Sequence, residues 1–161
     1  MTARDIMTTR FDYLRPDATL REAVNLMKAA KGGAAASGVK ALMVLDSESR
    51  VSGIISMGDI LKAVFPKYMA VMELGDFTWD GMVEDIARKA GGRKVSEVMT
   101  RDVVTVEEDA PLMECVDHML KNGVKKLPVL GKDGSVAGII YERDLFFAIT
   151  RAMLEDEGGR T

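Results

Sequence analysis

Two short stretches of the sequence, GIISMGDI (residues 53–60) and GIIYERDL (residues 138–145), combine groups that could bind a polar ligand. Each places a glycine before two apolar residues and an aspartate at the head of an apolar, helix-like run. Glycine lets another backbone or a ligand approach a strand closely. A helix N-terminus favours anions and keeps Asp59 and Asp144 ionised. An ionised carboxylate accepts two hydrogen bonds, which suits the paired hydroxyls of a ribose. Ser56 and the amide groups of its turn could face a phosphate.

The same residues have a purely structural interpretation. Ser56 and Asp59 have the spacing of a capping box, in which each side chain satisfies the turn of the other. Tyr141, which stands in the second stretch where the first has Ser56, is not an N-cap residue. Asp144 is nevertheless retained there, which favours a ligand role for the aspartates. Capping and ligand binding both stay open, and the change to Tyr141 predicts two sites of different affinity.

The two stretches belong to a longer internal repeat. Residues 4–27 align with 96–119 without a gap, and residues 39–61 align with 124–146. The difference in residue number between aligned positions falls from 92 in the first block to 85 in the second. The first copy therefore carries seven extra residues, within the Ala/Gly-rich segment 28–38. A repeat of this kind indicates a duplicated structural unit.

Local patterns predict the elements of each unit. In the second copy, β-branched residues at 103–106 predict a short strand, and residues 111–123 have apolar side chains at helical spacing before Gly123, with Asp109 or a neighbour as the cap. Strands at 125–130 and 135–140 flank the turn GKDG, and residues 142–154 form a second helix. The order β-α-β-β-α is predicted for the first copy as well.

This order predicts the fold class α/β (α+β) with two tandem units. At about 55 residues each unit buries too little apolar surface to be stable alone, so we expect the two to pack sheet to sheet with pseudo-twofold symmetry. The predicted boundaries are 1–65 for the first unit, 66–94 for a connector, 95–154 for the second unit and 155–161 for a flexible tail. The connector carries a helix, MVEDIARKA (82–90), closed by Gly91 and Gly92, and the packing residues Tyr68, Phe77 and Trp79.

Composition narrows the function. With 22 basic and 25 acidic residues the net charge is −3, so nothing attracts the chain to nucleic acid or to anionic lipid. The absence of a long apolar run predicts no membrane span, and we expect a soluble, cytoplasmic protein. Cys115, the sole cysteine, falls on an apolar helix face and is predicted as a core residue. His118 lies three residues further along the same helix, but a helix offers this pair neither an oxyanion hole nor a third group, so no catalytic set is predicted. No cluster of His, Cys and carboxylate residues has metal-ligand spacing, so no metal site is predicted. The chain is therefore not expected to be an enzyme.

Each repeated unit resembles the CBS domain, and the two units in tandem resemble a CBS pair, or Bateman module. The resemblance depends on the opening Met-Thr pairs (7–8 and 99–100), on the helices beginning at Leu20 and Leu112, and on a V-K-x-L-x-V strand. Above all it depends on the motif G-h-h-x-x-x-D, where h is apolar. It covers residues 3–65 and 94–150.

The resemblance implies a regulatory module that binds adenosine derivatives in clefts between the units. AMP, ADP, ATP, S-adenosylmethionine and NAD are the expected effectors, and no cofactor is required. The motif aspartates would hold ribose with support from Ser56, the segments after the opening methionines would line the base, and basic residues would meet phosphates. The residues implicated are Thr8, Arg10, Phe11, Lys40, Ile55, Ser56, Asp59, Thr100, Asp102, Val103, Lys125, Lys126, Tyr141, Arg143 and Asp144.

CBS pairs commonly form homodimers, which implies an apolar contact surface on the second helices, ILKAVF and LFFAI. Because no effector domain is fused, the signal would pass in trans to a partner protein or through dimer geometry. The alternative is a scaffold that associates with itself or with a partner and binds no nucleotide. In that case the motif aspartates would serve only as caps.

Overall fold

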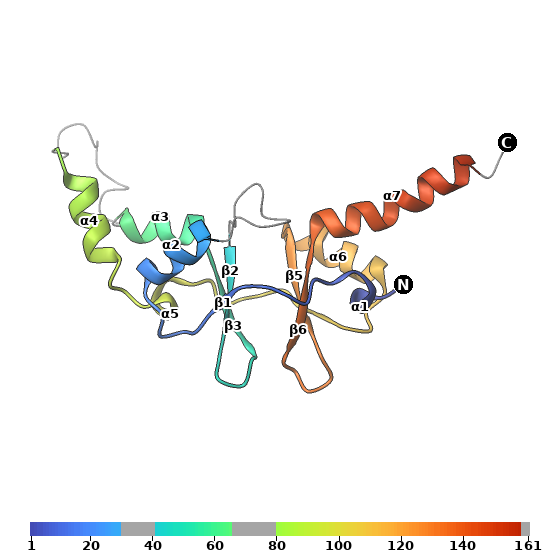
Figure 1. Cartoon of the computed structure of the whole chain (residues 1–161), viewed down its shortest axis with the longest axis horizontal. Coiled ribbons are helices and arrows are strands. Elements are labelled where there is room, and N and C mark those ends of the chain that lie inside the picture. The colour runs from blue at the N-terminus through green and yellow to red at the C-terminus, as the bar shows by residue number, and fades with distance from the viewer. Residues whose placement is uncertain (30–40, 66–79, 159–161) are drawn as a thin grey trace. The chain divides into compact units, whose positions relative to one another are not determined.

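The computed structural model describes residues 1–29, 41–65 and 80–158, and they fall into two compact units (Figure 1). The first, called here the β1–β3 unit, comprises Asp12–Ser47 and Val51–Val103. The second, the β4–β6 unit, comprises Met1–Phe11, Glu48–Arg50 and Val104–Thr161. The predicted Lys40, most of the 28–38 insertion, and Tyr68, Phe77 and Trp79 lie outside the described residues.

The β1–β3 unit is built on a three-stranded sheet in the order β1-β2-β3. Strand β1 (Tyr13–Leu14) runs parallel to β2 (Ala41–Leu45), which pairs antiparallel with β3 (Val51–Ser56). The helices are α2 (Leu20–Ala29), α3 (Met57–Val64), α4 (Met82–Ala90) and α5 (Val95–Val98). Apolar side chains from the sheet and the helices form one core, among them the fully buried Leu20, Val44, Ile55 and Val95.

The β4–β6 unit repeats this plan. Its sheet has the order β4-β5-β6, with β4 (Val106–Glu107) parallel to β5 (Lys126–Leu130) and β5 antiparallel to β6 (Val136–Tyr141). The helices are α1 (Ala3–Ile6), α6 (Leu112–Asn122) and α7 (Glu142–Gly158). Its core contains the fully buried Cys115, Leu127, Val129 and Ile140.

Most of the predicted elements are present. The mixed α/β class is confirmed, as are the helix at 82–90, which Gly91 caps, and the turn at 131–134, where Gly134 has a φ of +84°. Strand β4 is shorter than predicted because only Val106 and Glu107 pair with β5. Sheet-to-sheet packing with pseudo-twofold symmetry stays a prediction.

The prediction that the side chain of Asp109 or of a neighbour caps α6 is wrong. The N-cap is Pro111, which makes no side-chain cap hydrogen bond. Pro111 aligns with Thr19 of the first repeat, and there a full capping pair forms. The Glu22 amide donates to Thr19 Oγ1 at 3.2 Å, and the Thr19 amide donates to Glu22 Oε2 at 3.0 Å. Proline has neither a hydroxyl nor an N–H, so the second repeat cannot form this pair.

Each compact unit contains the leading segment of the other repeat. Thr8 forms an antiparallel bridge with Ile139 of β6, and Thr100 forms the equivalent bridge with Ile54 of β3. Helix α1 therefore packs with the sheet of the second repeat, whereas α5 packs with the sheet of the first. Each leading segment thus belongs to one repeat by its position in the sequence but to the compact unit of the other repeat by its contacts.

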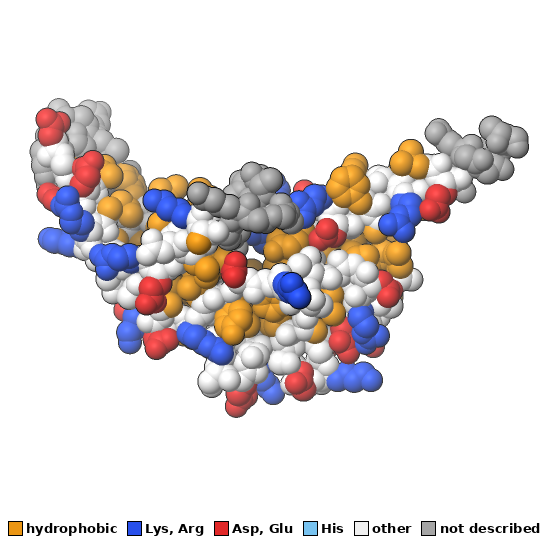
Figure 2. All heavy atoms as spheres, in the orientation of Figure 1, with side chains coloured by type: hydrophobic (Ala, Val, Ile, Leu, Met, Phe, Trp, Pro, Cys, Tyr) orange, Lys and Arg blue, Asp and Glu red, His pale blue; other side chains and the backbone are white. Residues whose placement is uncertain are grey.

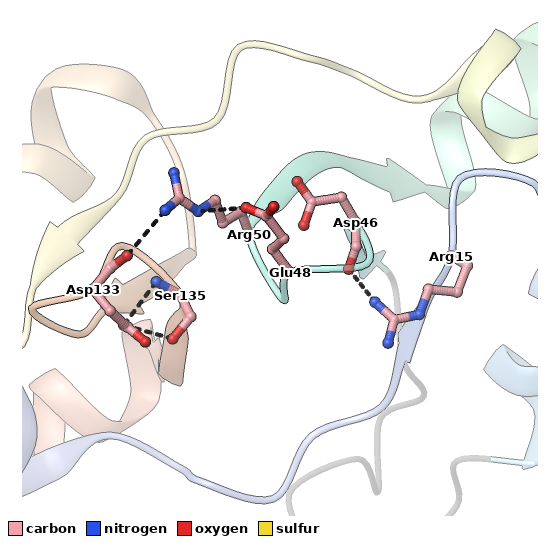
Figure 3. A network of polar contacts seen from close by, with 6 residues as sticks. All are labelled: Arg15, Asp46, Glu48, Arg50, Asp133 and Ser135. Atoms are coloured by element: carbon pink, nitrogen blue, oxygen red, sulfur yellow. Dashed lines mark hydrogen bonds and ion pairs between the residues drawn. The ribbon is translucent and has the colours of Figure 1, made fainter.

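The tip of the β2–β3 hairpin, residues 48–50, belongs to the β4–β6 unit (Figure 3). There the Val136 amide donates to the Ser49 carbonyl at 2.9 Å, and Arg50 Nη2 donates to the Asp133 carbonyl at 3.3 Å. The Asp133 carboxylate in turn accepts the amide and the hydroxyl of Ser135. Within the β1–β3 unit, Arg15 donates to the backbone carbonyl of Asp46.

Candidate functional site

The Asp59 carboxylate lies in the first turn of α3, directly after β3 ends at Ser56. The Ser56 amide donates to Asp59 Oδ2 at 2.9 Å, and the Asp59 amide donates to Ser56 Oγ at 3.1 Å. These reciprocal bonds form the capping box that the sequence spacing allowed. They also hold a half-buried carboxylate at the positive end of a helix, where its charge is favoured.

A second donor reaches the same carboxylate from the leading segment of the second repeat. Thr100 Oγ1 lies 3.2 Å from Asp59 Oδ1 and 3.4 Å from Oδ2. The backbone of Thr100 is fixed on β3, because its amide donates to the Ile54 carbonyl at 2.8 Å and its carbonyl accepts the Ile54 amide at 2.9 Å. Residues far apart in the sequence therefore meet at Asp59.

Gly53 makes this approach possible. A Cβ atom at Gly53 would stand 2.7 Å from the Thr100 carbonyl oxygen and 2.7 Å from Met99 Sδ. Of the two roles that the sequence left open for this glycine, close approach by another backbone is the one observed. Ile55, which was predicted to contact ligand, is fully buried in the core.

The Asp144 carboxylate occupies the equivalent place in the β4–β6 unit, where β6 ends at Tyr141 and α7 begins. The Tyr141 amide donates to Asp144 Oδ2 at 3.4 Å, which is 0.5 Å longer than the 2.9 Å bond at Asp59. Tyr141 also pairs across the sheet with Lys126, whose Nζ lies 5.7 Å from the centre of the phenol ring. This distance is within the range of a cation–π interaction.

The leading segment of the first repeat approaches this site as Thr100 approaches the other. The Thr8 amide donates to the Ile139 carbonyl at 2.8 Å, and the Ile139 amide donates back to the Thr8 carbonyl at 3.0 Å. A Cβ atom at Gly138 would stand 2.8 Å from both the Thr8 carbonyl oxygen and Met7 Sδ. The glycine, the strand and the threonine therefore have the same local arrangement in both units.

The two units divide the predicted site residues into two sets. The β1–β3 unit holds Ser56 and Asp59 together with the segment 100–103 that was predicted to line a base. The β4–β6 unit holds Tyr141 and Asp144 together with the segment 8–11 that was predicted to line the other base, and with the described basic candidates. Sequence reasoning did not assign either base-lining segment to a particular aspartate. The first set is Ile55, Ser56, Asp59, Thr100, Asp102 and Val103, and the second is Thr8, Arg10, Phe11, Lys125, Lys126, Tyr141, Arg143 and Asp144.

A hollow of about 450 Å³ between α2, α3 and α4 was not predicted. None of the predicted site residues is among its described lining residues. Its walls are mostly apolar, and the guanidinium of Arg21 packs at its edge, with Nη2 2.9 Å from where a Cβ on Gly91 would stand. No separate signal for this hollow is present in the sequence, because its apolar residues have the same helical spacing as core residues. They include Leu20, Val24, Ile60, Val64, Ala87 and Ala90.

The only cysteine is a core residue, as predicted. Cys115 is fully buried on α6, and this burial raises the pKa of its thiol. The described residues contain no group of three His, Cys, Asp or Glu side chains able to hold a metal ion. Of the helices in the described part of the chain, none combines the length and apolar composition needed to cross a membrane.

Two small α/β units with matching glycine, threonine and aspartate positions define a tandem repeat of one domain type. The CBS domain profile matches residues 3–66 and 95–151. The chain therefore belongs to the CBS domain family and is a tandem CBS pair, the class of module that has regulatory roles.

Comparisons with individual proteins agree with this assignment. An uncharacterized 17.7 kDa protein of Acidianus ambivalens is 33% identical over 150 residues, which cover 93% of this chain and 71% of that protein. Inosine-5′-monophosphate dehydrogenase of Methanocaldococcus jannaschii is 29% identical over 88% of this chain, but the match covers only 21% of the enzyme. The crystal structure of CBSX2 in complex with AMP matches with a TM-score of 0.68 and 23% identity, covering 94% of this chain and 98% of that one.

Proposed function

We propose that this CBS pair senses an adenosine-containing nucleotide and has no catalytic activity of its own. The observation that carries the proposal is the Asp59 carboxylate, held at the start of α3 by the Ser56 amide and the Thr100 hydroxyl. A similar fold in CBSX2 was solved with AMP, which supports an adenine nucleotide as the ligand class.

The hydrogen-bonding capacity of Asp59 matches a ribose. A carboxylate offers about four lone-pair sites. The Ser56 amide and the Thr100 hydroxyl occupy two of them, so two remain for the 2′- and 3′-hydroxyls of the sugar. AMP, ADP, ATP, S-adenosylmethionine and NAD all present this diol. The base would lie against the segment after Thr100, near Asp102 and Val103.

The second site differs from the first in charge and shape. Lys125, Lys126 and Arg143 add positive charge beside Asp144, which favours a ligand with several phosphates. The Tyr141 ring stands where the first site has the small Ser56 hydroxyl. We therefore propose two sites of unequal affinity, with Thr8, Arg10 and Phe11 on the base side of the second.

The output of the module would be a change in self-association or in contact with an effector protein. Helix α7 continues past the sheet of its unit and exposes apolar side chains along its length (Figure 2), with Phe146 58% and Phe147 61% exposed. Leu61 and Phe65, on and just after α3, are also exposed. Apolar surfaces of this kind mark protein contacts, and a homodimer through α3 and α7 is the proposed state.

Sedimentation of paired charge variants tests the homodimer. Phe147→Lys places a charge on the α7 surface and is expected to shift the protein toward monomer. Val83→Lys changes an equally exposed apolar residue on α4 and is expected to leave association unchanged. Equal sedimentation of wild type and Phe147→Lys would rule out α7 as the contact.

Thermal unfolding with a nucleotide series tests the sensor function. AMP, ADP, ATP, S-adenosylmethionine, NAD and GTP are compared on the wild type, Asp59→Ala and Asp144→Ala. A ligand at 100 times its dissociation constant stabilises by about 2.7 kcal/mol, which raises the midpoint by several degrees. We expect an adenosine ligand to give this shift and one aspartate variant to abolish it. A well-folded protein that responds to none of them would overturn the proposal.

The complete capping box at Ser56 and Asp59 also favours a second candidate, a scaffold that binds no nucleotide. In that case the carboxylate acts only within the fold. Asp59→Ala would then lower stability to the same extent with and without nucleotide, whereas a sensor loses its ligand response as well.

A further inference from the structure

We infer that the Thr100 hydroxyl is a positioning group that orients the Asp59 carboxylate toward a cis-diol. This inference rests on the proposed function and adds a residue that sets ribose affinity at one site. Its starting point is the place of Thr100 Oγ1, which lies 3.2 Å from Asp59 Oδ1 and 3.4 Å from Oδ2 and can donate its one hydrogen to this carboxylate.

A carboxylate with one hydrogen bond is poorly oriented. The terminal torsion of an aspartate is broad, so the single bond from the Ser56 amide fixes one oxygen and leaves the plane of the group free to turn. The Thr100 donor reaches the carboxylate from a different segment and restricts this rotation. The remaining lone pairs then keep a constant direction before ligand arrives.

The position of Thr100 is itself well determined. Two backbone hydrogen bonds of 2.8 and 2.9 Å join it to Ile54 on β3, and the same strand ends at Ser56. One strand therefore sets the places of both donors to Asp59. Thr100 is exposed while Asp59 is half-buried, so the contact lies where a ligand could reach it.

The other unit provides an internal comparison. Thr8 forms the same backbone bridge to Ile139, and Gly138 permits the same close approach. The amide that donates to Asp144, however, belongs to Tyr141 and lies 3.4 Å away, against 2.9 Å at Asp59. The Asp59 carboxylate is thus better oriented than that of Asp144. We therefore infer that ligand binding depends more strongly on the ribose diol at the Asp59 site than at the Asp144 site.

The test measures binding of AMP and of 2′,3′-dideoxy-AMP to the full chain by calorimetry. Thr100→Val keeps the shape of the side chain and removes the donor, and Thr100→Ser keeps the donor. Thr150→Val is the matched control on α7, where the hydroxyl donates only to the Phe146 carbonyl and lies outside both sets of site residues. Orienting a side chain is worth a factor of about two to ten in affinity. We expect Thr100→Val to bind AMP weaker by about this factor and Thr100→Ser to match wild type. Thr150→Val should leave AMP affinity unchanged.

The dideoxy analogue separates positioning from a structural effect. It lacks both hydroxyls, so Thr100→Val should bind it as the wild type does. Equal AMP affinity of wild type and Thr100→Val, or an equal loss for both ligands, would overturn the inference and leave the sensor function intact. Failure of the wild type to bind AMP or any other nucleotide of the series would overturn the proposed function and this inference with it.

Discussion

The carbonyl oxygen of Thr100 lies 2.7 Å from the point at which a Cβ atom of Gly53 would stand. Thr8 and Gly138 repeat this relationship at 2.8 Å in the other unit. In both cases the neighbour is backbone held by a pair of hydrogen bonds, so it cannot move aside cheaply. The glycines of the two motifs are therefore required by the fold, whatever ligand binds nearby.

Gly53→Ala is expected to destabilise the protein by about 1–3 kcal/mol, because an added methyl group in a filled space forces backbone shifts. Gly58→Ala is the matched control. The nearest atom to its Cβ would be Ser56 Oγ at 3.7 Å, which is ordinary contact, and alanine favours the helix. Urea unfolding measures both variants, and equal stabilities for the two would contradict the packing argument.

Ser56→Ala is expected to cost about 1 kcal/mol of unfolding free energy, because the Asp59 amide loses its acceptor at the start of α3. Ser56→Thr keeps an acceptor and should stay close to wild type. Thr19→Ala, which removes the cap of α2, should cost a similar amount. A neutral Ser56→Ala would show that water replaces the cap without loss.

The Asp133 carboxylate accepts the Ser135 hydroxyl and amide, and these bonds hold its pKa below the usual value of 3.8. A lowered folded pKa means that the contribution to stability is present above pH 3.8 and is lost as the pH falls through the folded value. An NMR titration should find this lowered midpoint. Ser135→Ala should raise it toward 3.8, and an unchanged midpoint would exclude the hydroxyl as its cause.

Cys115 should react slowly with a thiol reagent in the folded protein, because it is fully buried and burial raises its pKa above the usual 9.0. The raised pKa gives a contribution to stability that is present below pH 9.0 and is lost as the pH rises through the folded value. Since it is the sole cysteine, the labelling rate reports on the β4–β6 core alone. Fast labelling at neutral pH without denaturant would contradict the burial.

Local patterns were enough to predict much of the fold. Helical spacing of apolar residues indicated α2 and α6, and the glycine-rich turn at 131–134 indicated the β5–β6 hairpin. The spacing of Ser56 and Asp59 predicted a capping box that is present. These features depend on residues close together in the sequence, where propensity and hydrogen bonding act directly.

The partners of the leading segments could not be predicted in the same way. Residues 7–8 and 99–100 are both Met-Thr, and both acceptor strands contain GII, so either segment fits either strand by local pattern. Which pairing forms depends on the path of the intervening chain. For the same reason the role of Thr100 at Asp59 was missed, and it was expected only to line the base.

The exchange of leading segments also limits how the protein can be divided. A polypeptide of the first repeat alone would contain Gly53 and Asp59 but not the segment of Thr100 that packs on them. Its own Met7-Thr8 segment would then be free to cover Gly53 of another copy. A single ancestral repeat with this geometry is thus suited to a domain-swapped dimer, and gene duplication would turn an exchange between two molecules into an exchange within one.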